Sequence, residues 1–204
     1  FPLATYPLAA LCLHTEFSPL PGLTFRESLY NGVASDRINR QFRFCPRSDG
    51  MFNIGSLSYH IGEEDRHHGY YAVGYALGSS PSETSADKTF NYALWTLIEQ
   101  PLLHVGESHL GAMWQGGTSP ASRSTCRHYW GAGLIWSNIP PQMTQVGLVV
   151  NRALYADGRE TDVELTGSFP VCNHFTLQPA VHCINTNGNY TAAAQLRAIL
   201  EFGN

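Results

Sequence analysis

The residues of this chain that could do chemistry are spread over many short segments, and they form no recognised catalytic motif. Serine, histidine and aspartate all occur, but the sequence has neither a G-x-S-x-G elbow nor an H-E-x-x-H signature. The densest group is "GEEDRHHG" at 62–69, which mixes acids with histidines in a turn between two alternating segments. We interpret it as a solvated loop, and predict no catalytic residues, no metal site and no cofactor.

The cysteines do not indicate a metal site or a disulfide framework. There are five, an odd number, and no C-x-x-C pair that would suggest zinc. Cys172 and Cys183 are close in sequence, but about ten extended residues would hold them roughly 30 Å apart. We therefore interpret the cysteines mainly as small side chains.

The polar residues alternate regularly with apolar ones when the segments are interpreted as β-strands. Around the turn of "VELTGSFPVCNHFTLQPAVHCINTNG" (163–188), apolar and polar residues alternate, so each strand has one apolar and one polar face. Three acids, Glu160, Asp162 and Glu164, share the polar side of the first strand. Gln178 and His182 share the polar side of the second.

The same two-residue alternation runs through the chain, whereas helical periodicity is nearly absent. It is clear at 8–17, 23–30, 41–44 and 70–77, and it continues to the closing "TAAAQLRAILEF". Turn-rich stretches such as "GSSPSETSADK" separate the segments. The pattern predicts about 11 or 12 strands in a single all-β domain covering 1–204.

Composition narrows the class of protein. Charged residues make up only 14% of the chain, below the usual quarter, and the net charge is −4, which does not suggest a nucleic-acid partner. No apolar run reaches the roughly 18 to 20 residues of a membrane-spanning helix. The opening "FPLATYPLAALCL" lacks a basic leader and contains Pro2 and Pro7, so we expect a mature or truncated product rather than a signal peptide.

Two all-β architectures fit the alternation. A soluble sandwich turns its apolar faces inward, whereas an outer-membrane barrel turns them toward lipid and lines a wet lumen with the polar faces. Small residues on the polar faces favour a crowded lumen; these are Gly74, Ala76, Gly111, Gly131, Gly133 and Ala180. Trp130 and Trp136 share an apolar face at a spacing that puts one of them near an interface. Other aromatic residues, such as Tyr71, Phe175 and Phe202, lie near strand ends, where an aromatic belt would be. Glu27 breaks its apolar face, and Pro179, inside a strand, suggests a bulge.

The order and the amino-acid sequences of the strands resemble those of the carbohydrate-selective porins of the OprB family. The similarity lies in "YPLAALCLHTEFSPLPGLTFRESLYNG", in "SDGMFNIGSLSYHIG" with "GYYAVGYALGSS", in "ETDVELTGSFPVCNHFTLQPAVHCINTNG", and in the closing "AAAQLRAILEF". It covers nearly the whole chain but only the C-terminal part of a family member. The five cysteines, and Ala180 and His182 after Leu-Gln-Pro, depart from the family pattern.

The resemblance implies an antiparallel transmembrane β-barrel, sixteen-stranded in the family, whose N-terminal strands are missing here. It implies a trimeric channel in the outer membrane of a Gram-negative bacterium, which passes glucose and related sugars by facilitated diffusion and performs no enzymatic reaction. The alternatives are a secreted soluble all-β carbohydrate-binding module and a truncated porin remnant that does not conduct.

A sugar pore needs hydrogen-bond donors and acceptors that replace water around the sugar hydroxyls. The candidate pore-lining residues are the polar ones on the polar faces: His14, Glu16, Arg26, Arg43, Glu160, Asp162, Glu164, Gln178, His182 and Arg197. Arg197 or Arg43 is expected to balance the three acids. The plainer interpretation is a wet lumen whose charges only pair with one another.

Overall fold

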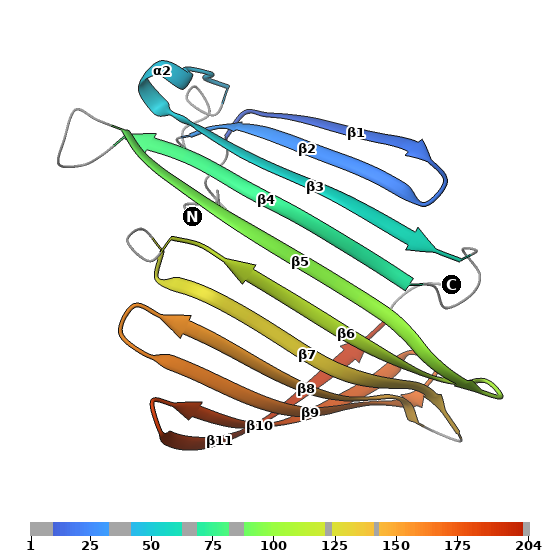
Figure 1. Ribbon diagram of the computed structural model, residues 1–204. Coiled ribbons are helices and arrows are strands. Elements are labelled where there is room, and N and C mark those ends of the chain that lie inside the picture. The colour runs from blue at the N-terminus through green and yellow to red at the C-terminus, as the bar shows by residue number, and fades with distance from the viewer. Residues whose placement is uncertain are drawn as a thin grey trace.

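The computed structural model describes residues 10–32, 42–62, 69–81, 88–120, 124–140 and 143–201, and Figure 1 shows their arrangement. These residues form eleven strands and one short helix. The elements are β1 (Cys12–Leu20), β2 (Leu23–Asn31), α2 (Pro46–Asp49), β3 (Met51–Ile61), β4 (Gly69–Pro81), β5 (Lys88–Val105), β6 (Ser108–Thr118), β7 (Cys126–Ile139), β8 (Met143–Tyr155), β9 (Arg159–Cys172), β10 (Phe175–Thr186) and β11 (Asn189–Leu200).

All eleven strands belong to one antiparallel sheet in which each strand pairs with its neighbours in sequence. The expectation of an all-β, antiparallel fold with 11 or 12 strands is therefore confirmed. A sandwich would need two facing sheets, so that alternative does not describe this chain. Among the described residues β1 pairs only with β2, and β11 only with β10, which leaves the sheet open at both edges.

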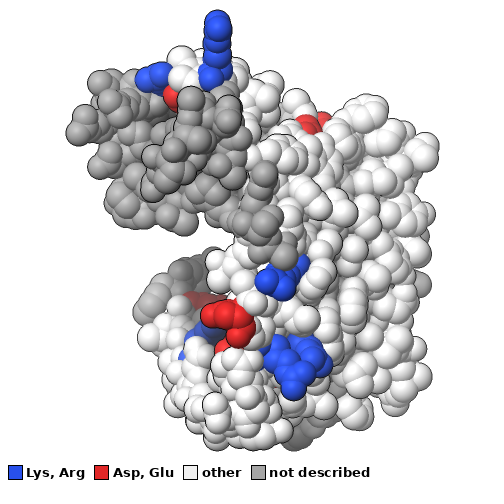
Figure 2. Space-filling view, turned by 60° about the vertical axis from the view of Figure 1, so that its left-hand side comes forward, with Lys and Arg blue, Asp and Glu red and all other residues white. Residues whose placement is uncertain are grey.

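The sheet curves around a hollow, and its two faces differ in exposure and chemistry (Figures 1 and 2). Ser58 and Ala72 lie opposite each other on β3 and β4 and are only 1% and 3% exposed. Their sequence neighbours Leu57 and Val73 project to the other side and are 44% and 54% exposed. We call the face of Ser58 and Ala72 the inner face, and the face of Leu57 and Val73 the outer face. The inner face carries most of the polar and small residues, with some large apolar ones such as Phe52 and Trp95 among them, and the outer face is largely apolar.

The sheet has two ends. The connections after β2, β4, β6, β8 and β10 all lie at the end that carries α2, which we call the α2 end. The opposite end holds tight turns such as the one between β1 and β2, where Gly22 has φ 79°. A left-handed backbone of this kind suits glycine because it has no Cβ.

The strand expected at 41–44 is wrong in its described part, because residues 42–45 lie outside the sheet and lead into α2. Two alternating aromatic residues are too short a pattern to fix a strand when a proline follows. Here Pro46 begins the helix, and the Cys45 N–H donates to the Asn31 side chain at 3.1 Å instead of to a neighbouring strand.

The bulge suspected at Pro179 is also absent. The β10–β11 register passes through Pro179 and Leu196 without a shift, and the shift in the β9–β10 register lies at Phe175/Thr176. The Pro179 carbonyl accepts a bond of 3.2 Å from the Thr166 hydroxyl on β9, so the proline nitrogen points to the same side. Pro179 has no N–H to donate to β9. Residues 178 and 179 accordingly have no ladder pairs with β9.

Glu27, which interrupts an apolar face in the sequence, does lie on the outer face, but it has partners there. Its carboxylate accepts hydrogen bonds from the Tyr75 hydroxyl at 3.0 and 3.1 Å and from the Asn53 amide. Gly55 lies beneath this group, and a Cβ at that position would be 2.7 Å from the Tyr75 ring. The glycine thus makes room for a polar cluster on an otherwise apolar surface.

The remaining outer-face features match an aromatic surface without cross-links. Trp114 and Trp130 stack with ring centroids 6.0 Å apart, and Trp136 is half exposed. All five cysteines are free. Among the described residues no helix is long or apolar enough to pass through a membrane. Phe202, the aromatic expected at the end of the last strand, lies outside the described residues.

Candidate functional site

The inner face carries a first polar cluster on β1–β3. Arg26 lies opposite Glu16 in the β1–β2 register and donates from Nε to its carboxylate at 2.7 Å. It also donates to the Ser58 hydroxyl at 3.3 Å. His14 Nδ1 lies 2.7 Å from the Ser28 hydroxyl. Both side chains of the ion pair are at least 40% exposed, so water screens it and it contributes little to stability.

A second polar cluster crosses β6, β7 and β8. Gln115 donates to the Tyr129 hydroxyl at 2.6 Å, and that hydroxyl donates to Asn151 at 2.8 Å. Gly131 lies between the two amides in the register, and a Cβ there would be 2.5 Å from the Asn151 oxygen. The three side chains can converge only because position 131 is glycine.

Sequence reasoning missed this second cluster. Gly131 was already assigned to the polar face, and Tyr129 is two residues away on the same strand, so strand parity alone would have placed Tyr129 there. Gln115 and Asn151 required the pairing register, which brings both opposite Gly131.

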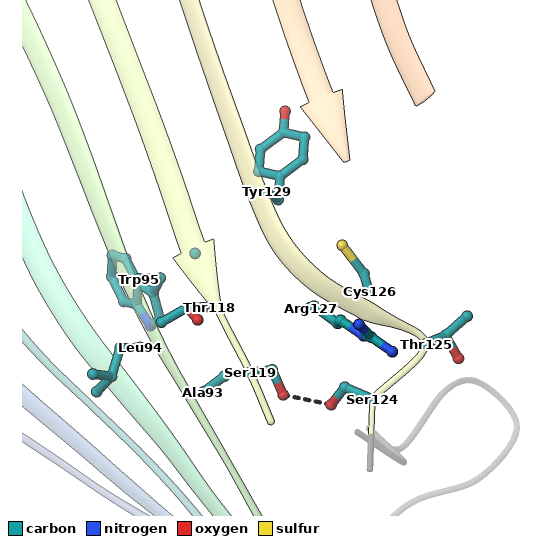
Figure 3. A pocket seen from close by; sticks show the side chains of 11 residues that line it. Ala93, Leu94, Trp95, Thr118, Ser119, Ser124, Thr125, Cys126, Arg127 and Tyr129 are labelled. Atoms are coloured by element: carbon teal, nitrogen blue, oxygen red, sulfur yellow. Dashed lines mark hydrogen bonds between the residues drawn. The ribbon is translucent and has the colours of Figure 1, made fainter. Parts of the chain in front are cut away.

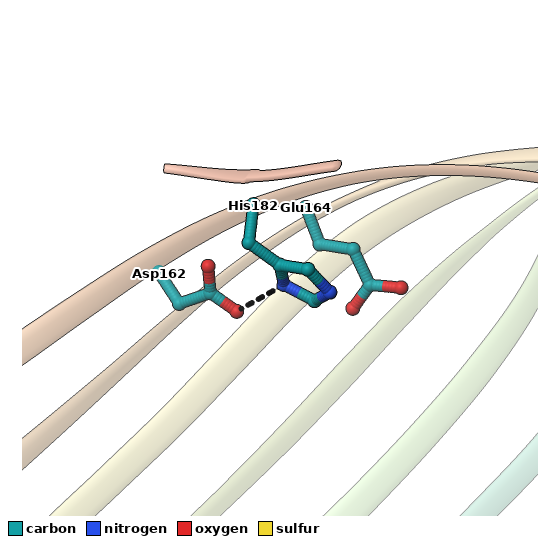
Figure 4. A group of neighbouring side chains, drawn as sticks. All are labelled: Asp162, Glu164 and His182. Atoms are coloured by element: carbon teal, nitrogen blue, oxygen red, sulfur yellow. Dashed lines mark hydrogen bonds and ion pairs between the residues drawn. The ribbon is translucent and has the colours of Figure 1, made fainter. Parts of the chain in front are cut away.

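The third cluster joins the acids of β9 to β10 (Figure 4). His182 lies directly opposite Glu164, and its Nδ1 is 3.1 Å from a carboxylate oxygen of Asp162. The other Asp162 oxygen is buried and has no hydrogen-bond partner in the described part of the chain. One ligand atom from each of the three residues lies within 4.8 Å of the others. A carboxylate–imidazole set of this kind could hold a divalent metal ion, while the hydrogen bond to Asp162 already orients the imidazole.

Of the ten residues predicted to line a pore, all except Arg43 lie on the inner face. Glu160 accepts a bond of 3.2 Å from Thr186, and Gln178 lies opposite Arg197. Arg43 lies in the segment before α2, where it forms an ion pair with Asp49 at 3.3 Å. Its expected pairing with the acids of β9 is therefore wrong, because the segment does not join the sheet. The acid–histidine loop at 63–68 lies outside the described residues.

A pocket of about 400 Å³ opens beside the second cluster at the α2 end (Figure 3). Trp95 and Tyr129 line it together with the hydroxyls of Ser119 and Ser124, which hydrogen-bond to each other. The indole of Trp95 lies over Gly74 on the inner face, where any Cβ at position 74 would overlap the ring. An aromatic ring beside several hydroxyl groups provides both kinds of contact that a sugar ring uses.

Comparison with known proteins gives a match at the level of fold. No protein-family profile matches the chain. No curated protein sequence matches it either. A solved structure described as the high pH structure of Pseudomonas putida OprB superimposes with a TM-score of 0.71 at 13% sequence identity. The match covers 95% of this chain and 58% of that one, so this chain spans less than two thirds of its length. At this identity the likeness establishes the fold of the sheet.

Proposed function

We propose that this chain forms part of the wall of an outer-membrane channel, and that the channel passes glucose and related monosaccharides by diffusion without chemical conversion. The observation that carries the proposal is the opposition of the two faces within one porin-like sheet. Leu57, Val73 and Leu94 are about half exposed on the outer side, and hydrogen-bonded polar groups occupy the inner side. A soluble protein rarely exposes so much contiguous apolar surface, whereas a lipid-facing wall requires it.

The inner face supplies groups suited to a neutral hydrophilic solute. Gln115, Tyr129 and Asn151 offer amide and hydroxyl groups that can exchange hydrogen bonds with sugar hydroxyls. Trp95 offers a ring face for the apolar side of a pyranose. On this face the Arg26–Glu16 ion pair compensates two of the charges.

The complete wall would include further strands beside the open edges of β1 and β11. Within the described part of the chain both edges carry unpaired backbone groups, which a membrane does not satisfy. Location in a Gram-negative outer membrane and assembly as a homotrimer are proposals that rest on the family resemblance and on the likeness in fold to OprB.

The same open edges favour a second candidate function, a remnant that inserts into the membrane but does not conduct. Liposome swelling separates the two. The protein, reconstituted into liposomes, should make them swell faster in isotonic glucose than in a disaccharide such as sucrose, and protein-free liposomes should not swell. Flotation with the liposomes, but no swelling, would identify the remnant. A purified chain that stays monomeric without detergent would contradict both candidates.

A further inference from the structure

A second pocket lies at the rim of the sheet at the α2 end and shares Arg127 with the pocket beside the second cluster. It has a volume of about 590 Å³ and is formed where β7, β8 and β9 meet the turn between β10 and β11. Its polar lining consists of Arg127, His128, Arg159 and Asn187, together with tyrosine and backbone groups. None of the described residues that line it is acidic.

The floor of the pocket is built by two interlocked turns. The Arg159 N–H donates to the Asn187 side-chain oxygen at 2.8 Å, and the Asn187 N–H donates to the Arg159 carbonyl at 3.0 Å. Gly158 makes this possible, because a Cβ at that position would overlap the Asn187 amide. The oxygen of Asn187 is thus occupied, so its NH₂ group is what remains for a ligand.

The basic side chains retain hydrogen-bonding capacity. Arg127 donates from one Nη to the Ala156 carbonyl at 3.3 Å, but its Nε is buried and has no partner in the described part of the chain. No ion pair joins Arg127 or Arg159 to an acid among the described residues. His128 Nδ1 lies 3.0 Å from the Thr118 hydroxyl, which fixes the ring.

Nearby acids do not neutralise this pocket. Asp157 belongs to the same turn as Gly158 but is exposed and does not line the pocket. Glu160 accepts a bond from Thr186 on the inner face. Figure 2 shows basic and acidic side chains next to one another at this end of the molecule, and within the described residues none of the acids forms an ion pair with Arg127 or Arg159.

We propose that this pocket binds an anionic group of the phosphate class. Two arginines, a histidine and an asparagine line it, and guanidinium, imidazole and amide N–H groups are the donors that phosphate oxygens accept from in proteins. The ligand phosphate belongs either to a lipid headgroup or to a dissolved phosphate compound, since the pocket lies at the rim where the sheet meets its surroundings. This inference does not depend on whether the chain conducts sugar.

The test is titration calorimetry of the detergent-solubilised full chain with inorganic phosphate, compared with the variant Arg159→Gln. This side chain is exposed, and its removal leaves the backbone bonds to Asn187 in place. We expect phosphate binding to weaken by about tenfold or more, the loss of one charge-assisted hydrogen bond. Arg47→Gln, which removes the same charge at an exposed position of α2 outside the pocket, should bind phosphate like the unmodified protein.

A second arm identifies the source of the phosphate. The protein is reconstituted into phosphatidylcholine vesicles with or without monophosphoryl lipid A, and its thermal unfolding midpoint is measured. A rise with lipid A that Arg159→Gln abolishes assigns the pocket to a lipid phosphate. Binding of inorganic phosphate that Arg159→Gln weakens, without such a rise, assigns it to a dissolved compound. If neither ligand distinguishes Arg159→Gln from Arg47→Gln, the proposal is wrong.

Discussion

Glu27 is a charged residue on the outer face, and in the proposed channel wall a carboxylate on that face is costly unless it is paired. Its partners come from two other strands, Asn53 on β3 and Tyr75 on β4, and Gly55 leaves the space in which they meet. The cluster therefore ties β2, β3 and β4 together at a point where simple alternation would place another apolar side chain.

Tyr75→Phe should destabilise the protein by about 1–3 kcal/mol, because the Glu27 carboxylate loses a donor in a place that water does not readily reach. The measurement is urea unfolding of the protein in phospholipid vesicles, followed by tryptophan fluorescence. Tyr59→Phe is the matched control. Tyr59 lies on β3 and is exposed on the outer face, the same face as Tyr75. The double variant Glu27→Leu with Tyr75→Phe should recover most of the loss, and equal effects of Tyr75→Phe and Tyr59→Phe would refute this role for Glu27.

The substitution Gly131→Ala tests whether the second cluster, formed by Gln115, Tyr129 and Asn151, depends on the glycine at position 131. The added methyl would be 2.5 Å from the Asn151 oxygen and 3.0 Å from the Gln115 nitrogen, so the cluster must separate. We expect a loss of about 1–3 kcal/mol, as is common for an added methyl group in a packed site. Gly111→Ala, where the nearest atom is 3.6 Å away, should cost much less. Similar losses in both variants would show that the cluster does not depend on Gly131.

At the level of strands, the open sheet predicts a gradient of backbone stability. Among the described residues, β7, β8 and β9 have hydrogen-bonded neighbours on both sides, whereas β1 and β11 have one each. Amide hydrogen exchange should therefore be slowest in the central strands and fastest in the two edge strands. Mass spectrometry of the detergent-solubilised chain measures this directly. Protection of β1 and β11 equal to that of β8 would mean that the edges are paired, with each other or with another copy.

The strands themselves were predictable from sequence because two-residue alternation depends only on local order. The same rule placed nearly all the predicted polar residues on one face. It could not supply register, and register is what sets His182 opposite Glu164 and brings Gln115 and Asn151 together over Gly131. Pairings between strands depend on the whole sheet, so no local pattern contains them.

The segment around Arg43 and the strand position of Pro179 show a second limit. Alternation over four residues could not distinguish a strand from the stretch before α2, which is held by the side chain of Asn31. Proline suggested a bulge, but the sheet kept its register and used the Thr166 hydroxyl to bond the Pro179 carbonyl. In both places a side-chain hydrogen bond replaces a ladder bond, and sequence periodicity does not reveal such replacements.

At the scale of the whole molecule, the proposed channel wall requires the outer face to point toward lipid and the inner face to point toward the lumen. The inner face holds small and hydrogen-bonded residues around a hollow, and the outer face holds exposed aliphatic and aromatic side chains. Tryptophans report on both: Trp95 lies on the inner face over Gly74, and Trp136 lies on the outer face, 50% exposed. They can be observed separately in variants that retain only one of the four tryptophans.

The most direct measurement is fluorescence quenching of these two single-tryptophan variants, with the other tryptophans replaced by phenylalanine, in vesicles of brominated phospholipid. The account predicts that brominated lipid quenches Trp136 strongly and Trp95 weakly, and that aqueous iodide shows the opposite order. This holds whether or not the channel conducts. Strong lipid quenching of Trp95 together with iodide quenching of Trp136 would mean that the faces are reversed, and would contradict the proposed channel wall.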